Sequence, residues 1–276
     1  MTSPGSSSVS VDNVSKAYKQ RSVLKNINLQ IPANKFTVVV GPSGCGKSTL
    51  INLIAGYEPL DNGSIVACGR AVDGPKYDRL VVFQETALFP WKTTLENVSF
   101  GPLSRGLHPK DVQVRARDII ERFGLSGFET KYPGQLSGGM QRRAELARAI
   151  INTPSIMLLD EPFRGLDAMT RGLMQAYLLK LFEEQQITTL FVTSDLEEGI
   201  YLADVLVVLS ASPASVKSVI NVDLPRPRDF KMLATARFAE IHKEVLRTLF
   251  ARDSTHPTQV HLGNEPIQSA EFQQRG

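Results

Sequence analysis

Short alternations of apolar and polar residues lie between Val9 and Leu29 and indicate β-strands. Further along, several apolar runs lack this alternation and are rich in β-branched residues, which is typical of strands buried on both faces of a sheet. These runs span residues 36–40, 80–83, 155–159, 188–193 and 205–209. The spacing of apolar residues between them predicts helices at 48–55, 138–152, 169–185 and 196–203.

This order of strands and helices predicts an α/β core with a largely parallel sheet and right-handed crossovers. Residues from about 85 to 150 carry helical patterns and little strand signal, so we expect a helical insertion there. The core domain is expected over residues 9–250. A Ser-, Gly- and Pro-rich leader at 1–8 is expected to be disordered, and residues 251–276 form a polar tail.

Composition narrows the class of protein. With 276 residues, 42% of them apolar and 21% charged, the chain can bury a large core, which excludes a disordered or fibrous protein. The net charge of +3 is too small and too evenly spread to indicate a nucleic-acid partner. Two cysteines make no disulfide framework and fit a reducing compartment. Apolar runs are far shorter than the ~20 residues of a membrane span, and residues 1–8 resemble neither signal peptide nor anchor, so a soluble cytoplasmic protein is expected.

A glycine-rich turn between the strand at 36–40 and the helix at 48–55 fits the pattern G-x-x-x-x-G-K-[ST]. Its glycines let backbone N–H groups converge on phosphate oxygens, and the helix N-terminus adds positive charge. We expect Lys47 to neutralise the β- and γ-phosphates and Ser48 to offer its hydroxyl to Mg²⁺. The alternative is a plain turn before a helix. The residues predicted to contact a nucleotide here are Gly41, Pro42, Ser43, Gly44, Cys45, Gly46, Lys47, Ser48 and Thr49.

Cys45 lies inside this turn, close to a helix N-terminus. That position favours a lowered thiol pKa and makes Cys45 a possible handle for alkylation. The favoured interpretation is nevertheless a small residue tolerated at a variable position of the turn.

Two acids, Asp160 and Glu161, end the apolar run that begins near residue 155. The carboxyl end of a buried strand is where ligands bind in open α/β folds. Asp160 is therefore expected to hold Mg²⁺ through water, and Glu161 to polarise the attacking water. Without the phosphate turn, the same pair would be typical of a solvated turn.

A second helix begins with a motif suited to an anion. Ser137 is a good N-cap, and Gly138 and Gly139 leave the helix N-terminus open. Taken alone, this motif is also an ordinary helix cap.

Together these motifs resemble the nucleotide-binding subunit of an ABC transporter over about residues 9–225. The resemblance implies a P-loop NTPase core with an antiparallel β subdomain and a helical insertion, which uses ATP and Mg²⁺. In that family, LSGG is the signature motif. Ser137, Gly138 and Gly139 are therefore expected to contact the nucleotide held by the phosphate loop of a second ATPase subunit, in a head-to-tail dimer.

Three further residues match motifs of this family. Gln84 resembles the Q-loop glutamine, which senses Mg²⁺ and the γ-phosphate and links to the membrane subunit. Tyr18 resembles the aromatic residue that stacks on adenine, although a tyrosine here is also typical of a core position. Asp167 follows Gly165 and Leu166 and resembles the D-loop, which crosses the dimer interface.

The chain departs from the family after the strand that ends at Thr193. The family usually has His followed by Asp there, whereas this chain has Ser194 and Asp195. A serine donates one hydrogen bond but carries no charge, and charge-assisted bonds to phosphate are about twice as strong. We therefore expect slow hydrolysis with intact ATP binding. In the competing interpretation, Glu161 is sufficient for catalysis and the loss of rate is mild.

The stretch from Phe83 to Trp91, Met140 and residues 224–228 resemble the importers of nitrate, sulfonate and taurine, a group with bicarbonate and pyrimidine-precursor relatives. The resemblance implies a membrane permease as direct partner, an extracytoplasmic substrate-binding protein as indirect partner, and a peripheral location on the cytoplasmic face of the inner membrane. Trp91 is expected to face the permease; the alternative is a core position. The sequence carries no pocket that identifies the substrate.

Two other functions stay open. One is a regulatory or hydrolysis-poor subunit paired with a different, active ATPase subunit, which Ser194 favours. The other is a non-transport ABC ATPase. Such proteins generally carry two cassettes or coiled-coil or zinc insertions, and the sequence has neither these nor a basic stripe for nucleic acid.

Overall fold

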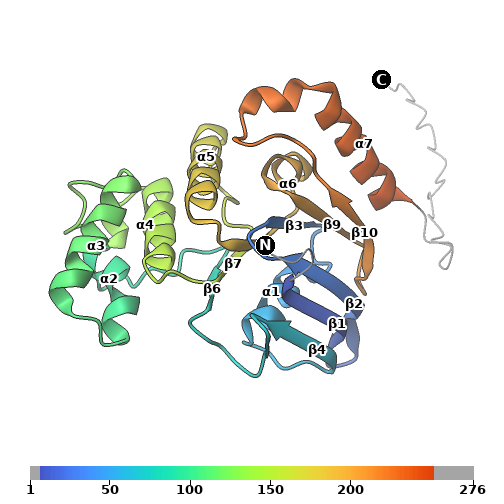
Figure 1. The fold of residues 1–276 in the computed structure, drawn as a ribbon, viewed down its shortest axis with the longest axis horizontal. Coiled ribbons are helices and arrows are strands. Elements are labelled where there is room, and N and C mark those ends of the chain that lie inside the picture. The colour runs from blue at the N-terminus through green and yellow to red at the C-terminus, as the bar shows by residue number, and fades with distance from the viewer. Residues whose placement is uncertain (1–6, 252–276) are drawn as a thin grey trace, which may run out of the picture.

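Two β-sheets form the centre of the molecule, and helices pack around them (Figure 1). The structure, a computed structural model, describes residues 7–251. A four-stranded antiparallel sheet has the order β2-β1-β4-β5, with bounds Arg21–Pro32, Ser7–Tyr18, Asn62–Ala67 and Arg70–Ala71. A six-stranded sheet has the order β10-β9-β3-β8-β7-β6, with bounds Val216–Asn221, Val205–Leu209, Phe36–Val40, Thr188–Thr193, Ile156–Asp160 and Arg79–Val82.

The larger sheet is parallel from β9 to β6, and only β10 runs antiparallel to its neighbour. Every residue of β3, β7, β8 and β9 is buried, as continuous apolar runs require. The helix α1 (Lys47–Ala55) packs between this sheet and the antiparallel one. The opposite face is covered by α5 (Ala168–Gln185), α6 (Leu196–Leu202) and α7 (Ala236–Phe250).

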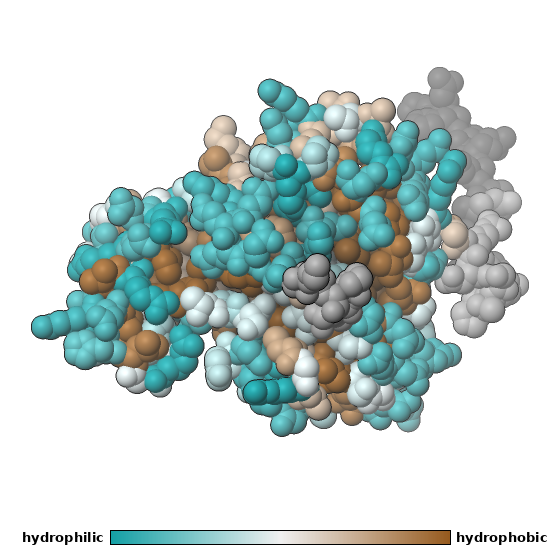
Figure 2. Space-filling model, viewed as in Figure 1, coloured by the Kyte–Doolittle hydropathy of each residue, from teal (hydrophilic) through white to brown (hydrophobic). Residues whose placement is uncertain are grey.

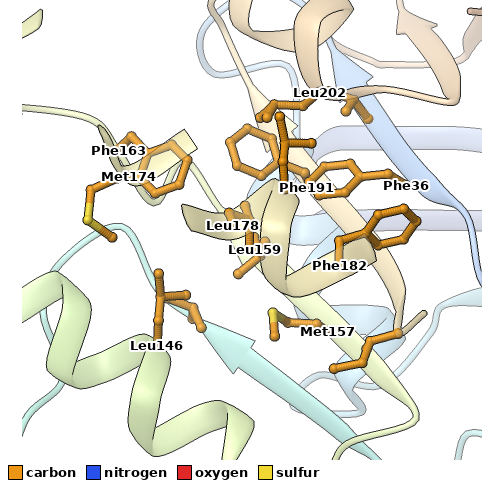
Figure 3. Close-up of a cluster of buried hydrophobic side chains, with 14 of the residues drawn as sticks. Phe36, Leu146, Met157, Leu159, Phe163, Met174, Leu178, Phe182, Phe191 and Leu202 are labelled. Atoms are coloured by element: carbon orange, nitrogen blue, oxygen red, sulfur yellow. The ribbon is translucent and has the colours of Figure 1, made fainter. Parts of the chain in front are cut away.

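Aromatic side chains pack tightly on that helix-covered face (Figure 3). The ring centroids of Phe36 on β3 and Phe182 on α5 are 5.3 Å apart in an edge-to-face arrangement. Phe191 on β8 lies 6.0 Å from Phe36, so one cluster joins two strands and a helix. This packing holds together β3 and β8, the strands that lead to the phosphate loop and to Ser194.

Three helices lie to one side of the sheets and form the helical insertion (Figure 1). They are α2 (Thr94–Ser104), α3 (Pro109–Arg122) and α4 (Gly138–Ile150). The helix α2 begins with a capping box between Thr93 and Glu96, and α4 is capped by Ser137. Figure 2 shows apolar surface scattered among hydrophilic residues over α2 and α3. Within residues 7–251, no helix is long and apolar enough to cross a membrane.

The start of the first strand differs from the sequence prediction. Ser7 pairs with Pro32, and the carbonyl oxygen of Ser8 accepts a hydrogen bond of 2.8 Å from the backbone N–H of Cys68. Assigning residues 7 and 8 to a disordered leader was therefore wrong, because main-chain pairing needs no apolar side chain. The rest of the leader, residues 1–6, and the tail from residue 252 lie outside the described residues. The short 3-10 helices Pro133–Gln135 and Phe230–Ala234 complete the structure.

Candidate functional site

Four neighbouring strands of the large sheet carry the phosphate loop and three other predicted site residues at their carboxyl ends. In sheet order these are β3, β8, β7 and β6, all parallel. The phosphate loop follows β3, Ser194 follows β8, Glu161 follows β7, and Gln84 lies two residues after β6. Since parallel strands end at one edge, segments far apart in sequence meet there.

The phosphate loop joins β3 directly to α1. Gly44 and Gly46 have φ of 74° and 114°, a region that side chains disfavour. A Cβ on Gly46 would lie 2.8 Å from side-chain atoms of Val23 and Leu24, so only glycine fits. No side chain caps the N-terminus of α1. Its first N–H groups are therefore available to an anion.

Lys47 directs its ammonium group into this loop. The side chain is buried, and Nζ donates hydrogen bonds to the carbonyl oxygens of Gly41 at 2.9 Å and Pro42 at 3.1 Å. It also lies 3.8 Å from Oε1 of Glu161. A buried ammonium held by loop carbonyls is suited to meet a phosphate anion, because the phosphate brings the negative charge that the carbonyl oxygens lack.

Ser48 and Asp160 lie together beside Lys47. The hydroxyl of Ser48 donates a hydrogen bond of 3.0 Å to Oδ1 of Asp160. Burial raises the pKa of Asp160, and the bond from Ser48 partly offsets this effect. A carboxylate disfavoured by burial gains from a nearby cation, and a hydroxyl with a carboxylate is a donor set that fits Mg²⁺.

Glu161 is held in an unusual backbone conformation at the end of β7. Its φ is 40°, and its N–H donates a hydrogen bond of 3.0 Å to the carbonyl oxygen of Val192 on β8. Its side chain is only 10% exposed, and Oε2 accepts a hydrogen bond of 3.0 Å from Nη1 of Arg164. The strained residue thus presents its carboxylate to the cavity above the sheet.

That cavity has a volume of about 500 Å³. The residues that line it include Tyr18, Lys47, Ser48, Gln84 and Glu161, which the structure therefore brings together. They combine an aromatic ring, a cation, a hydroxyl, an amide and a carboxylate around one space. This set can bind an aromatic base, its phosphates and a divalent cation.

Tyr18 lies at the rim of the cavity and not in the core. Its side chain is 43% exposed, and its hydroxyl hydrogen-bonds to Glu58. The ammonium of Lys16 lies 5.5 Å from the centroid of the ring. The alternative of a core tyrosine is therefore wrong, and the ring is available for stacking.

Cys45 is a small buried residue of the phosphate loop, in line with the favoured interpretation of the sequence. Its thiol is buried against Gly41, where an added Cβ would lie 3.1 Å from Sγ of Cys45. Burial raises the pKa of the Cys45 thiol, and the charge of Lys47 lowers it by less. The lowered thiol pKa and the use of Cys45 as an alkylation handle are therefore wrong, because burial disfavours the thiolate.

The signature motif lines a separate cavity of about 410 Å³. The Ser137 side chain accepts a hydrogen bond of 3.3 Å from the N–H of Met140, and Gly138 and Gly139 follow it at the start of α4. Asp167 lines the same cavity and caps α5, accepting a bond of 3.0 Å from the N–H of Thr170. Among the described residues, no residue lines both this cavity and the phosphate-loop cavity. The two motifs thus occupy different surfaces of one chain.

A buried ion pair holds the loop that carries Gln84, and sequence reasoning missed it. Arg142 and Glu145 on α4 are 5% and 3% exposed and bond at 2.6 Å. Arg142 donates to the carbonyl oxygens of Phe83 at 2.7 Å and Gln84 at 2.5 Å. Oε1 of Glu145 accepts a bond of 3.0 Å from the N–H of Ala87. The i,i+3 spacing was visible in the sequence, but it is equally typical of an exposed pair.

Comparisons with known proteins agree with this geometry. A family described as "ABC transporter" matches residues 24–164. The chain belongs to the ATP-binding proteins of ABC transporters, and it is an ATPase of this class. The fold is that of ABC ATPase cassettes, as predicted.

Individual relatives cover most of the chain. An uncharacterised ABC transporter ATP-binding protein of Methanocaldococcus jannaschii is 44% identical over 87% of this chain and 90% of its own. The aliphatic sulfonates import ATP-binding protein SsuB of Bacillus cereus is 41% identical over 87% of this chain and 94% of its own. The taurine import ATP-binding protein TauB of Escherichia coli O157:H7 is 43% identical over 76% of this chain and 82% of its own. A dimeric bacterial ABC transporter cassette superposes with a TM-score of 0.69 at 30% identity, over 79% of this chain and 100% of that one. The predicted family and subgroup are thereby confirmed.

Proposed function

We propose that this chain binds and hydrolyses ATP to energise a bacterial importer of a sulfonate, taurine or a similar small anion or polar solute, such as nitrate or bicarbonate. Support for the substrate class comes from the two import proteins, for sulfonates and for taurine, that are 41% and 43% identical. The observation that carries the ATPase chemistry is the 500 Å³ cavity in which Lys47, Ser48 and Glu161 face one another.

The residues of this cavity divide the chemistry among them. Lys47 binds the phosphates, while Ser48, Asp160 and Gln84 hold Mg²⁺. When bound, Mg²⁺ neutralises charge on the phosphate oxygens. Glu161 orients the water that attacks the γ-phosphate. Catalysis of phosphoryl transfer rests largely on positioning and charge, which are what these side chains can supply.

The active form is a dimer with ATP between subunits. Support comes from the separation of the Ser137 cap from the phosphate loop within one chain, and from the dimeric cassette at 30% identity. In this arrangement Ser137, Gly138 and Gly139 of one subunit contact ATP on the phosphate loop of the second ATPase subunit. The loss of the γ-phosphate removes that bridge and reopens the dimer.

The membrane permease binds beside the Gln84 loop. Trp91 is 70% exposed, so the alternative of a core tryptophan is wrong. Its ring lies 5.5 Å from Phe89, and the ring of Phe89 lies 4.8 Å from that of Phe100. A group of aromatic rings that reaches solvent is typical of a protein interface. This contact places the chain peripherally on the cytoplasmic face of the inner membrane, with the extracytoplasmic substrate-binding protein as an indirect partner.

Hydrolysis at this chain's own site is slow because Ser194 replaces the usual histidine. Ser194 lines a cavity together with Glu161 but offers only a hydroxyl. The same observation favours a second candidate, a hydrolysis-poor subunit paired with a different active ATPase subunit. We expect Ser194→His to raise steady-state ATPase activity by about tenfold, the worth of a charged over a neutral hydrogen bond. An unchanged rate would remove this part of the proposal.

Three experiments test the rest of the function. Glu161→Gln should trap an ATP-loaded dimer, measured by light scattering with ATP and Mg²⁺, and full turnover by this variant would refute the role of Glu161. Lys47→Ala should abolish ATP binding or turnover under the same conditions of ATP and Mg²⁺. Affinity purification of the wild-type chain should recover a membrane permease, whereas bound RNA or DNA would support a non-transport ATPase.

A further inference from the structure

The carboxylate of Glu161 lies between two cations. Its Oε2 accepts a hydrogen bond of 3.0 Å from Nη1 of Arg164, and its Oε1 lies 3.8 Å from Nζ of Lys47. The backbone N–H of Arg164 also donates to the carbonyl oxygen of Glu161 at 3.1 Å, so one turn places the two side chains together. Arg164 is 57% exposed, whereas Glu161 is 10% exposed. A nearly buried carboxylate is thus held by a cation that reaches solvent.

Ser194 lies in the same region. It lines a cavity of about 290 Å³ at the ends of β7 and β8, and Glu161, Arg164 and Arg171 line it too. Arg171 is turned toward Asp195, with Nη1 of Arg171 at 3.4 Å from Oδ2 of that residue. Arg164 is therefore the arginine of this cavity that bonds to Glu161.

We propose that Arg164 is a positioning residue for ATP hydrolysis: its guanidinium binds the Glu161 carboxylate more closely than Lys47 does, at 3.0 Å against 3.8 Å, and supplies the positive charge that Ser194 lacks. This inference rests on the proposed function, in which Glu161 orients the attacking water. Without Arg164, the neighbouring cation of Glu161 is Lys47, which is also needed by the phosphates of ATP. The carboxylate then competes with ATP for Lys47 and loses its orientation toward the water.

The test compares Arg164→Ala and Arg164→Lys with wild type in the full chain, using single-turnover hydrolysis of ATP with Mg²⁺ and a separate measurement of ATP affinity. A charged hydrogen bond at a half-exposed site is weaker than a buried one, so Arg164→Ala should lower the hydrolysis rate by about threefold to tenfold. Arg164→Lys should recover part of the rate because it keeps the charge. Equal rates in wild type and Arg164→Ala, or no recovery in Arg164→Lys, would overturn the inference.

A matched control is Arg122→Ala. Arg122 is 61% exposed and is paired with Asp118 at 3.0 Å, so it resembles Arg164 in exposure and pairing but lies on α3. Its substitution should leave the hydrolysis rate unchanged. A rate loss equal to that of Arg164→Ala would show that any exposed arginine has the effect, and would refute the specific role.

A second measurement separates positioning from a structural role. Arg164→Ala should weaken ATP affinity by about threefold in the wild-type background and leave it unchanged in Glu161→Gln, because the amide has no charge to compete for Lys47. The same weakening in both backgrounds would overturn the inference. If the wild-type chain neither binds nor hydrolyses ATP, the proposed function itself is refuted. If it hydrolyses ATP and Arg164→Ala does so equally fast, only the role of Arg164 is refuted.

Discussion

Glu145→Ala should strongly destabilise the protein, although Glu145 lies outside the nucleotide cavity. The substitution removes the carboxylate that pairs with Arg142 at 2.6 Å and accepts the N–H of Ala87 at 3.0 Å. Both charged side chains are at least 95% buried, at 5% and 3% exposure. The guanidinium is left in the interior with carbonyl oxygens as its partners and no counter-charge.

The magnitude follows from this burial. Removing one partner of a buried ion pair costs about 3–5 kcal/mol, and an unpaired buried N–H adds to the cost. The carbonyl oxygens of Phe83 and Gln84 still accept bonds from Arg142, which favours a central value of about 4 kcal/mol. For a chain of this length, each kcal/mol lowers the unfolding midpoint by about 2–3 °C, so we expect a decrease of about 10 °C.

Thermal unfolding followed by circular dichroism checks this value in the full chain. Arg122→Ala is the control, because it breaks the exposed 3.0 Å pair with Asp118 and should shift the midpoint by less than about 1 °C. The double substitution Arg142→Met with Glu145→Leu should lose less stability than Glu145→Ala, because it leaves no uncompensated charge. A midpoint for Glu145→Ala within about 1 °C of wild type would refute the reasoning.

Three further outcomes follow from single sites. Trp91→Ala should reduce co-purification of the permease and leave ATP affinity unchanged; lost ATP binding would instead show a packing role. Gly46→Ala should abolish ATP binding, measured by titration, because its φ of 114° and the 2.8 Å approach to Leu24 exclude a side chain. Burial raises the pKa of Glu198, so its contribution to stability is present below about pH 4 and is lost as pH rises through the raised value. Glu198→Gln should therefore gain stability relative to wild type as the pH rises above about 4, measured by urea unfolding at several pH values. A difference in unfolding free energy between the two proteins that does not change with pH would contradict this.

The central strands were predictable because their continuous apolar sequences indicate burial on both faces. Runs such as 36–40 and 188–193 have no polar face, and a strand without one must lie between two layers. The strand β10 was missed, because only Ile220 is fully buried in it and the alternation is weak. The helix α7 was also missed, although Phe238, Ile241 and Val245 form a buried stripe with helical spacing that the sequence contained.

The site was predictable where the chemistry is local. The phosphate loop needs its glycines and Lys47 within eight consecutive residues, so one segment carries the whole signal. The contacts that hold Gln84 in place join residues nearly 60 positions apart, such as Arg142 and Gln84 at a separation of 58. No local pattern encodes such a contact, because an arginine on a helix is equally able to face solvent.

The environment of Glu161 shows why the effect of Ser194 on hydrolysis is overstated when that residue is considered alone. The serine at position 194 implies that a positive charge is missing from this cavity. Arg164 supplies one, because its guanidinium lies 3.0 Å from the carboxylate of Glu161. If the two residues share one task, their substitutions are not additive. Ser194→His should then raise the rate by a larger factor in Arg164→Ala than in the wild-type background. Equal factors in the two backgrounds would mean that the serine and the arginine act independently, and that the missing histidine has no substitute in this chain.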